Sequence, residues 1–165
     1  MSYHFVTGDF QPQKVFLPDK EYGLALDALV KGCADVLLTR GEGASLRILL
    51  GKRKVEPQPD WWFVGGRTRP GDTPAEGAAR NVKRELGLAM ETRRFVHVNT
   101  YSFVWNYRQQ APSTNGTADA STVFELPLTQ AEADGLGPSK FDKDEYADAA
   151  WVQASFQASS ARPWQ

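Results

Sequence analysis

The segment 65–88 constrains this chain most, because it joins a double glycine to a helix whose two ends are both marked in the sequence. Thr73 is a good N-cap, Pro74 suits the first helical position, and Glu76 completes a capping box. Gly87 can end the helix in a left-handed conformation. The sequence therefore predicts a well-defined helix after a glycine loop, whose backbone can approach a ligand or offer a carbonyl to a metal.

On a helical wheel the predicted helix, 73–86, has one apolar stripe and one polar side. The apolar residues lie within an arc of about 100°; they are Ala75, Ala78, Ala79, Val82 and Leu86. The polar side carries Glu76, Arg80, Asn81, Arg84 and Glu85. Small alanines allow close packing on a sheet, which would turn the polar side toward a cleft. A helix with a merely solvated charged face is the alternative, and the adjoining glycine loop favours the cleft.

The rest of the chain alternates short helices and strands. We expect helices over 21–31 and 129–134, and strands over 34–39, 46–50, 61–64, 95–105, 122–126 and 149–152. The first two strands should form a hairpin. Residues 1–20 are expected to be irregular, and the polar stretch 108–120 a flexible loop. This mixture predicts an α/β fold with a mixed sheet, as a single domain over 1–165.

Composition excludes several classes of protein. The net charge is −1, so no general basic field would attract nucleic acid. No apolar run reaches membrane-spanning length and the N-terminus does not resemble a signal peptide, so a cytoplasmic protein with no membrane partner is expected. The single cysteine, Cys33, lies among apolar residues and is expected to be a buried structural thiol. A homodimer remains an open option.

The spacing of the central segment resembles the Nudix box. Gly66 is followed after five residues by Asp72 and after seven more by Arg80, with Glu85 and Gly87 further on. In that family the box is a loop–helix–loop that holds magnesium against a pyrophosphate, in an α/β/α sandwich. The sequence around Lys52–Arg53, the Trp-Phe-Val before the double glycine, and a late acid before a strand tryptophan also agree with the family. The resemblance implies a small-molecule nucleotide substrate.

The box departs from the family pattern at three acidic positions. Asp72 shortens one expected glutamate, and Asn81 and Arg84 replace two others, so that only Glu85 is retained. Fewer carboxylates leave less negative charge to hold Mg²⁺. Arg84 could repel a metal, or it could pair with a substrate phosphate.

A similarly thinned box occurs in the GDP-mannose mannosyl hydrolases, which this chain resembles. In that subgroup GDP is displaced by attack at the sugar carbon. The resemblance implies that Arg53 and Arg67 hold the diphosphate and assist catalysis. It also implies Mg²⁺, or alternatively Mn²⁺, on the Gly65 carbonyl and Glu85, with Glu145 as a third ligand.

The general base is less well determined. The subgroup's late histidine is matched here by Tyr146, whose ordinary pKa of about 10 makes it a poor base. Glu145 could act as the base instead of a ligand, whereas His97 is expected to pack within a strand. Arg80 is expected to orient Glu85.

Two further residues are candidates for substrate contact. Asp35 lies in a strand that would line the cleft, although it could equally be paired locally. Tyr107, like the tryptophans Trp61, Trp62 and Trp105, could stack on a nucleobase or could fill the core.

These observations predict a metal-dependent hydrolase of a nucleoside diphosphate linked to another group, most simply a nucleotide sugar such as GDP-mannose. One alternative is a pyrophosphatase that attacks phosphorus in ADP-ribose, a dinucleotide or a nucleoside triphosphate. The other is a non-catalytic nucleotide-binding module of the same fold.

Overall fold

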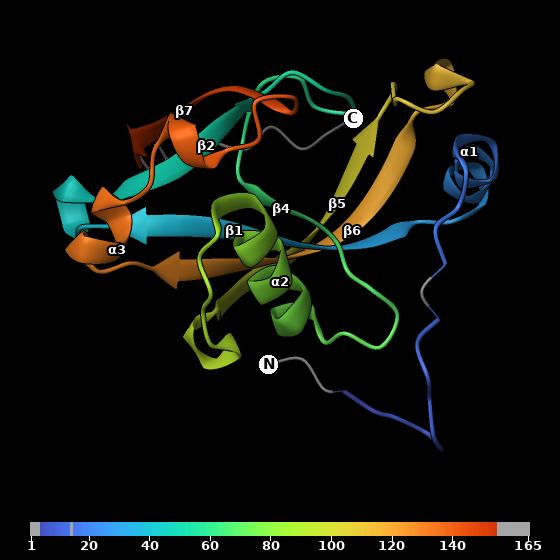
Figure 1. Ribbon diagram of the computed structural model, residues 1–165, viewed down its shortest axis with the longest axis horizontal. Coiled ribbons are helices and arrows are strands. Elements are labelled where there is room, and N and C mark those ends of the chain that lie inside the picture. Colours follow the sequence, from blue (N-terminus) through green and yellow to red (C-terminus); the bar gives the residue numbers. More distant parts are fainter. Residues whose placement is uncertain (1–3, 14, 155–165) are drawn as a thin grey trace, which may run out of the picture.

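A seven-stranded mixed sheet forms the centre of the molecule in a computed structural model that describes residues 4–13 and 15–154 (Figure 1). The strands are β1 (Lys31–Arg40), β2 (Arg47–Arg53), β3 (Trp61–Trp62), β4 (Val64–Arg67), β5 (Val96–Trp105), β6 (Thr117–Pro127) and β7 (Tyr146–Gln153). Their order is β3-β2-β1-β6-β5, with β4 also paired to β1 and β7 to β2. Only β1 and β6 run parallel. The expected mixed-sheet α/β fold is therefore confirmed.

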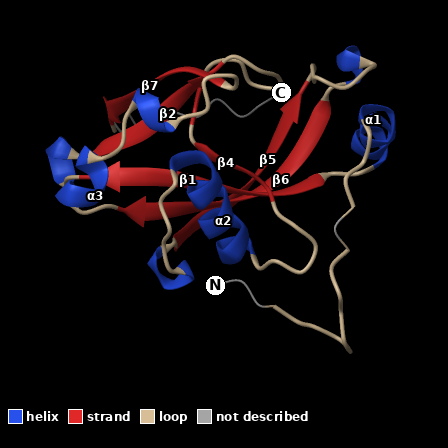
Figure 2. Cartoon of the chain, viewed as in Figure 1, coloured by secondary structure: helices blue, strands red, loops and turns tan. Residues whose placement is uncertain are grey.

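Helices flank the sheet (Figure 2). They are α1 (Asp19–Ala28), α2 (Pro74–Leu86) and α3 (Gln130–Asp134), with 3-10 turns η1 (Gly43–Ser45), η2 (Thr92–Arg94), η3 (Ser113–Asn115) and η4 (Pro138–Lys140). Helix α2 packs across β1 and β4, whereas α1 and α3 lie near opposite ends of the sheet. None of the described helices is both long and apolar enough to cross a membrane.

Helix α2 has the ends and the apolar stripe that its sequence predicts. The Thr73 hydroxyl accepts a hydrogen bond from the Glu76 backbone nitrogen at 3.2 Å, and Gly87 closes the helix with φ 69°. Val82 and Leu86 are buried in the core against the sheet. Gly77 is also needed here, because a Cβ on it would lie 2.6 Å from the Thr68 side chain. The helix can therefore lie close to β1 and β4. This close packing fixes the loop that joins β4 to α2.

Asn81 was predicted on the polar side of α2, and this prediction is wrong. The residue is fully buried. Its amide nitrogen donates to the carbonyls of Ala34 (3.1 Å) and Gly66 (2.9 Å), so its burial costs no unsatisfied donor. A helical wheel cannot predict this burial, because the two carbonyls that accept from Asn81 belong to strands β1 and β4.

The expected flexible loop over 108–120 is also wrong. Strand β6 already begins at Thr117, and Arg108 is only 2% exposed. The Arg108 guanidinium donates to Asp27 on α1 at 2.7 Å and to the Gly116 carbonyl at 3.0 Å. This segment is held against α1 by a buried arginine, which a reading of its polar composition missed.

Other element boundaries differ by a few residues. The first helix covers 19–28 rather than 21–31, because Lys31 instead begins β1 and pairs with Asp119 on β6 at 3.0 Å. The strand expected over 61–64 is divided into β3 and β4. The predicted β1–β2 hairpin is confirmed, and Cys33 is buried and free as expected. Burial raises the pKa of its thiol to about 12, so it is not poised as a nucleophile.

Candidate functional site

A cavity of about 200 Å³ opens between β1, β4, the end of α2 and the loop before β7. Most of the charged residues predicted for the site line it, namely Asp35, Arg53, Arg67, Arg84 and Glu145, together with Lys31 and the backbone of Gly65 and Gly66. Its apolar walls come from aromatic residues. Residues far apart in the sequence are thus brought to one place by the pairing of β1 with β4 and of β2 with β7.

The double glycine is required by close approach of the backbone. Gly65 pairs with Asp35 across β1 and β4, and a Cβ on Gly65 would lie 1.9 Å from the Asp35 carboxylate. Gly66 has φ 145°, which side chains other than glycine rarely adopt. The consequence is a segment of bare backbone at the cavity wall, with no side chain between the Gly65 carbonyl and its neighbours.

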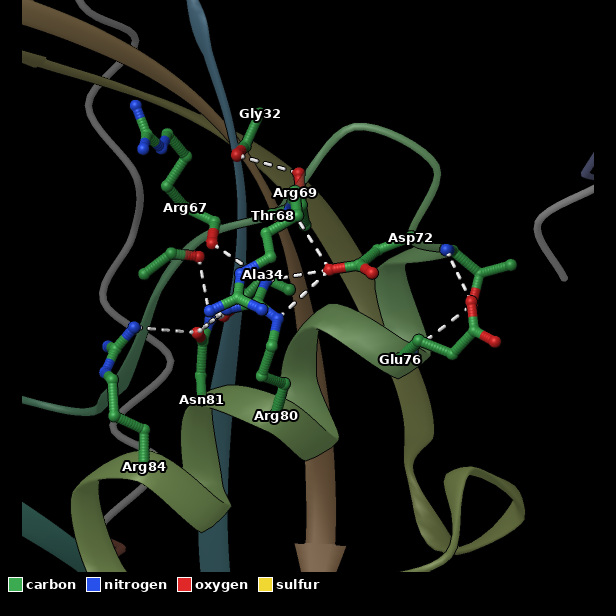
Figure 3. A network of polar contacts seen from close by, with 12 residues as sticks. Gly32, Ala34, Arg67, Thr68, Arg69, Asp72, Glu76, Arg80, Asn81 and Arg84 are labelled. Carbon is green, nitrogen blue, oxygen red and sulfur yellow. Dashed lines mark hydrogen bonds and ion pairs between the residues drawn. The ribbon is translucent and has the colours of Figure 1, made fainter. Parts of the chain in front are cut away.

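Asp72 and Arg80 fix the loop that leads into α2 (Figure 3). The Arg80 guanidinium donates to Asp72 Oδ2 at 3.1 and 2.8 Å and to the Arg67 carbonyl at 3.2 Å. The expectation that Arg80 orients Glu85 is therefore wrong. The guanidinium instead holds the glycine loop onto the helix, because Asp72 lies eight residues earlier, in the loop that precedes α2.

Arg84 lies at the junction of the glycine loop and α2. Its Nη2 is 3.2 Å from the Gly65 carbonyl oxygen and 2.6 Å from Glu85 Oε1, and its Nη1 is 3.2 Å from Asn81 Oδ1. The side chain is 54% exposed. The guanidinium thus binds three protein oxygens and still presents a free face to the cavity.

Glu85 lies beneath Arg84, with a side chain only 6% exposed. Its second carboxylate oxygen accepts a hydrogen bond from the Tyr146 hydroxyl at 2.5 Å. Burial raises the pKa of Glu85 above its ordinary value, and burial also raises that of Tyr146, next to the Glu85 charge. Tyr146 therefore acts as a donor to Glu85 and not as a base.

Arg53 and Glu145 form the opposite wall. Arg53 Nη2 is 3.0 Å from Glu145 Oε1, and the Arg53 side chain is 16% exposed. Among the described residues, the buried Nε of Arg53 has no hydrogen-bond partner. An unpaired charged donor beside a cavity is costly unless a ligand binds it. Arg67 packs over the Tyr22 ring at 5.2 Å.

Asp35 lies deep in the cavity and is 7% exposed. Its carboxylate accepts a hydrogen bond from the Ser121 hydroxyl. Burial raises its pKa to about 6, so the group holds a proton more readily than a surface aspartate. A carboxyl of this kind can donate a hydrogen bond as well as accept one.

The aromatic wall differs in part from the prediction. Trp62 and Trp105 line the cavity with their ring centroids 6.1 Å apart, edge to face. Tyr107 is 44% exposed and lies outside the lining residues. His97 packs edge to face on Phe124 at 5.9 Å, as expected. Lys31 and Tyr22 were not singled out, since Lys31 was placed at a helix end and Tyr22 among ordinary helical residues.

The groups expected to hold magnesium do not fit that ion as they are arranged. The Gly65 carbonyl and Glu85 both contact Arg84, and Glu145 contacts Arg53. Within residues 4–13 and 15–154, no three His, Cys, Asp or Glu side chains form a cluster that could hold a metal. Magnesium requires oxygen ligands in a near-octahedral arrangement. Here the oxygens that would ligate it accept hydrogen bonds from arginine nitrogens instead. The magnesium site therefore stays a prediction.

Comparison with known proteins bears on this geometry. Residues 31–156 match the family model of the NUDIX domain. A MutT NUDIX hydrolase from Burkholderia pseudomallei shares the fold, with a TM-score of 0.57 and 20% identity over 76% of this chain and 84% of that one. A MutT protein from Methanosarcina mazei Go1 is similar, with a TM-score of 0.53 and 19% identity over 75% and 77% of the two chains.

One curated protein also matches over a short stretch. It is an octanoyltransferase from Myxococcus xanthus, 36% identical over 53 residues. That stretch is 32% of this chain but only 15% of the relative. The chain thus matches a small part of that protein.

Proposed function

The chain belongs to the Nudix family, and we propose that it hydrolyses a nucleoside diphosphate joined to a second group, with a nucleotide sugar such as GDP-mannose as the leading substrate. The observation that carries the proposal is the grouping of Arg53, Arg67 and Arg84 around one cavity next to bare glycine backbone. Three guanidinium groups match the negative charge of a diphosphate, and each planar guanidinium can bind two phosphate oxygens at once.

The walls of the cavity suggest how such a compound would lie. The diphosphate would contact Arg53 and Arg67, and the base would stack on Trp62 or Trp105. Asp35 would hydrogen-bond the sugar or the base from the cavity floor. Tyr107 remains a weaker candidate for substrate contact, since it lies outside the lining residues.

In the proposed reaction, water attacks the sugar carbon that bears the diphosphate. The new carbon–oxygen bond forms as the bond to the diphosphate breaks, and the diphosphate leaves with the electron pair. Arg53 and Arg67 would stabilise the charge that develops on it. Glu145, held at 3.0 Å from Arg53, would take the proton of the water.

Nudix hydrolases generally use a divalent metal such as Mg²⁺, which supplies positive charge to the diphosphate when bound. The residues assigned to it in this chain are the Gly65 carbonyl, Glu85 and Glu145. All three contact arginine, so each would have to leave its arginine to bind the metal.

Attack at phosphorus, in ADP-ribose, a dinucleotide or a nucleoside triphosphate, is compatible with the same pocket. A structure of the NUDIX domain of Shewanella oneidensis NrtR, described as complexed with ADP ribose, shares the fold with a TM-score of 0.50 and 13% identity over 76% of this chain and 73% of that one. A non-catalytic nucleotide-binding module is the second candidate. The pairing of Glu85 and Glu145 with arginines favours it, because neither carboxylate is then free to act.

Nucleotide release from a panel of nucleotide sugars and dinucleotides tests the proposal. We expect release from the native chain and its loss in Glu145→Gln, whereas the adjacent exposed Asp144→Asn should behave as the native chain does. Water labelled with ¹⁸O should place its label in the sugar. Label in the phosphate would select the pyrophosphatase, and tight binding without release would select the non-catalytic module.

A further inference from the structure

One nitrogen of Arg84 lies between the two oxygens best placed to ligate a cation in this site. Nη2 is 3.2 Å from the Gly65 carbonyl and 2.6 Å from Glu85 Oε1. A backbone carbonyl and a carboxylate at the end of a helix are ordinary ligands of a hard divalent cation. A positive charge supplied by the chain itself therefore already occupies this place.

The guanidinium is held there by a third contact. Asn81 Oδ1 accepts from Arg84 Nη1 at 3.2 Å, while the Asn81 amide nitrogen is tied to the carbonyls of Ala34 and Gly66 (Figure 3). Because Asn81 is fully buried, its orientation is fixed. An acid at this position would have faced those two carbonyls with like partial charge. The replacements at 81 and 84 thus work together.

The charge of the arrangement is balanced without a metal. Glu85 is 6% exposed, and its two oxygens are taken by Arg84 and by the Tyr146 hydroxyl. A divalent cation would have to displace the guanidinium and then remain beside it. Arg84 itself is 54% exposed and lines the cavity, and its three contacts leave two of its five N–H donors unused.

We propose that Arg84 serves as a resident cation in place of a divalent metal, so that the pocket binds a diphosphate with no metal ion. The diphosphate part of this inference rests on the proposed function. The replacement of the metal by Arg84 rests on the contacts of Gly65, Asn81 and Glu85 alone.

Titration with Mn²⁺, followed by electron paramagnetic resonance, tests the replacement directly. The native chain and Lys83→Glu should leave Mn²⁺ free. Arg84→Glu removes the cation and adds a carboxylate, and should bind Mn²⁺ at least about tenfold more tightly. Lys83→Glu is the matched control, because it makes the same change of charge one residue away on an exposed position. Arg84→Gln serves as a second variant if Arg84→Glu fails to fold.

Binding of GDP, measured by calorimetry with EDTA or with Mg²⁺, tests the diphosphate part. Affinity for the native chain should be the same in both buffers and should fall about tenfold or more in Arg84→Gln, since a hydrogen bond between charged groups is removed. Lys83→Gln should leave it unchanged. Loss of native binding in EDTA, or tight Mn²⁺ binding by the native chain, would overturn the inference. Absence of GDP binding in both buffers would overturn the proposed function, while the Mn²⁺ titration would still decide the role of Arg84.

Discussion

Two of the arginine–glutamate ion pairs in the described part of the chain, Arg94–Glu132 and Arg84–Glu85, differ in what the arginine does beyond the pair. Arg94 in η2 holds both oxygens of Glu132 on α3, at 2.5 and 3.0 Å, and also donates to the Pro127 carbonyl at 2.8 Å. Arg84 contacts a single oxygen of Glu85 and keeps an exposed face toward the cavity. The first pair joins two segments of the fold, whereas the second leaves donors for a ligand.

The two glutamates respond oppositely to these surroundings. The Arg94 guanidinium holds the pKa of Glu132 at about 2, well below its ordinary value. Burial raises the pKa of Glu85, and the hydrogen bonds from Tyr146 and Arg84 offset it only in part. On the proposed function, spare donor capacity next to a cavity, and not the presence of an ion pair, is what would distinguish a binding arginine from a structural one.

The largest expected effect is on stability, at the residue that fixes Arg84. Asn81→Leu should lower the free energy of unfolding by about 2–3 kcal/mol, because the buried carbonyls of Ala34 and Gly66 lose a donor. Urea unfolding measures this, and Asn99→Leu, at an exposed position, is the control. A loss no greater than that of the control would show that Asn81 does not organise the site.

The second-largest expected effect is a loss of affinity for GDP. Arg53→Gln removes the charge opposite Arg84, and should weaken GDP binding by about 10- to 100-fold, as expected for loss of a hydrogen bond between charged groups. Its free energy of unfolding should change little, since removal of the buried, unpartnered Arg53 Nε offsets the loss of the ion pair with Glu145. Calorimetry and urea unfolding on one preparation provide both values. Unchanged GDP affinity would place the diphosphate elsewhere.

At the Arg94–Glu132 pair we expect the reverse, namely a loss of stability without a change in GDP affinity. Arg94→Gln should cost about 1 kcal/mol of stability, because a bidentate pair and a contact with the Pro127 carbonyl are lost while both side chains stay partly exposed. GDP affinity should not change. A weaker affinity for GDP in this variant would remove the distinction between the two pairs.

The smallest effect is a dependence of stability on pH. The folded-state pKa of Glu132 is about 2, below its ordinary 4.5, so its contribution is complete above about pH 4.5 and is lost as pH falls toward 2. The difference in unfolding free energy between the native chain and Glu132→Gln should therefore shrink over that range. A difference that stays constant from pH 5 to pH 2 would contradict the assigned pairing.

Much of the fold could be predicted from local signals. The caps Thr73 and Gly87 and the apolar stripe of α2 depend on neighbouring residues only, and the structure confirms them. The segment around Arg108 could not be predicted, because its order depends on Asp27, which lies 81 residues away. Local composition carries no information about such a partner.

The sequence predicted which residues line the site better than it predicted which of them contact one another. Arg53, Arg67 and Glu145 were found through motif positions, and the structure brings them to one cavity. The pairing of Arg84 with the Gly65 carbonyl could not be read from the sequence, since it depends on how β4 meets the end of α2. Lys31 was missed because its role depends on the register of β1 against β6.

The central claim is that arginines, with Arg84 at the metal's place, hold the diphosphate. Nuclear magnetic resonance of the Arg Nε–Hε and glycine amide groups, recorded during GDP titration in EDTA, tests it most directly. The account predicts shifts at Arg84, Arg53 and Gly66 in EDTA, with little further change on addition of Mg²⁺. Shifts that appear only after Mg²⁺ is added would contradict it.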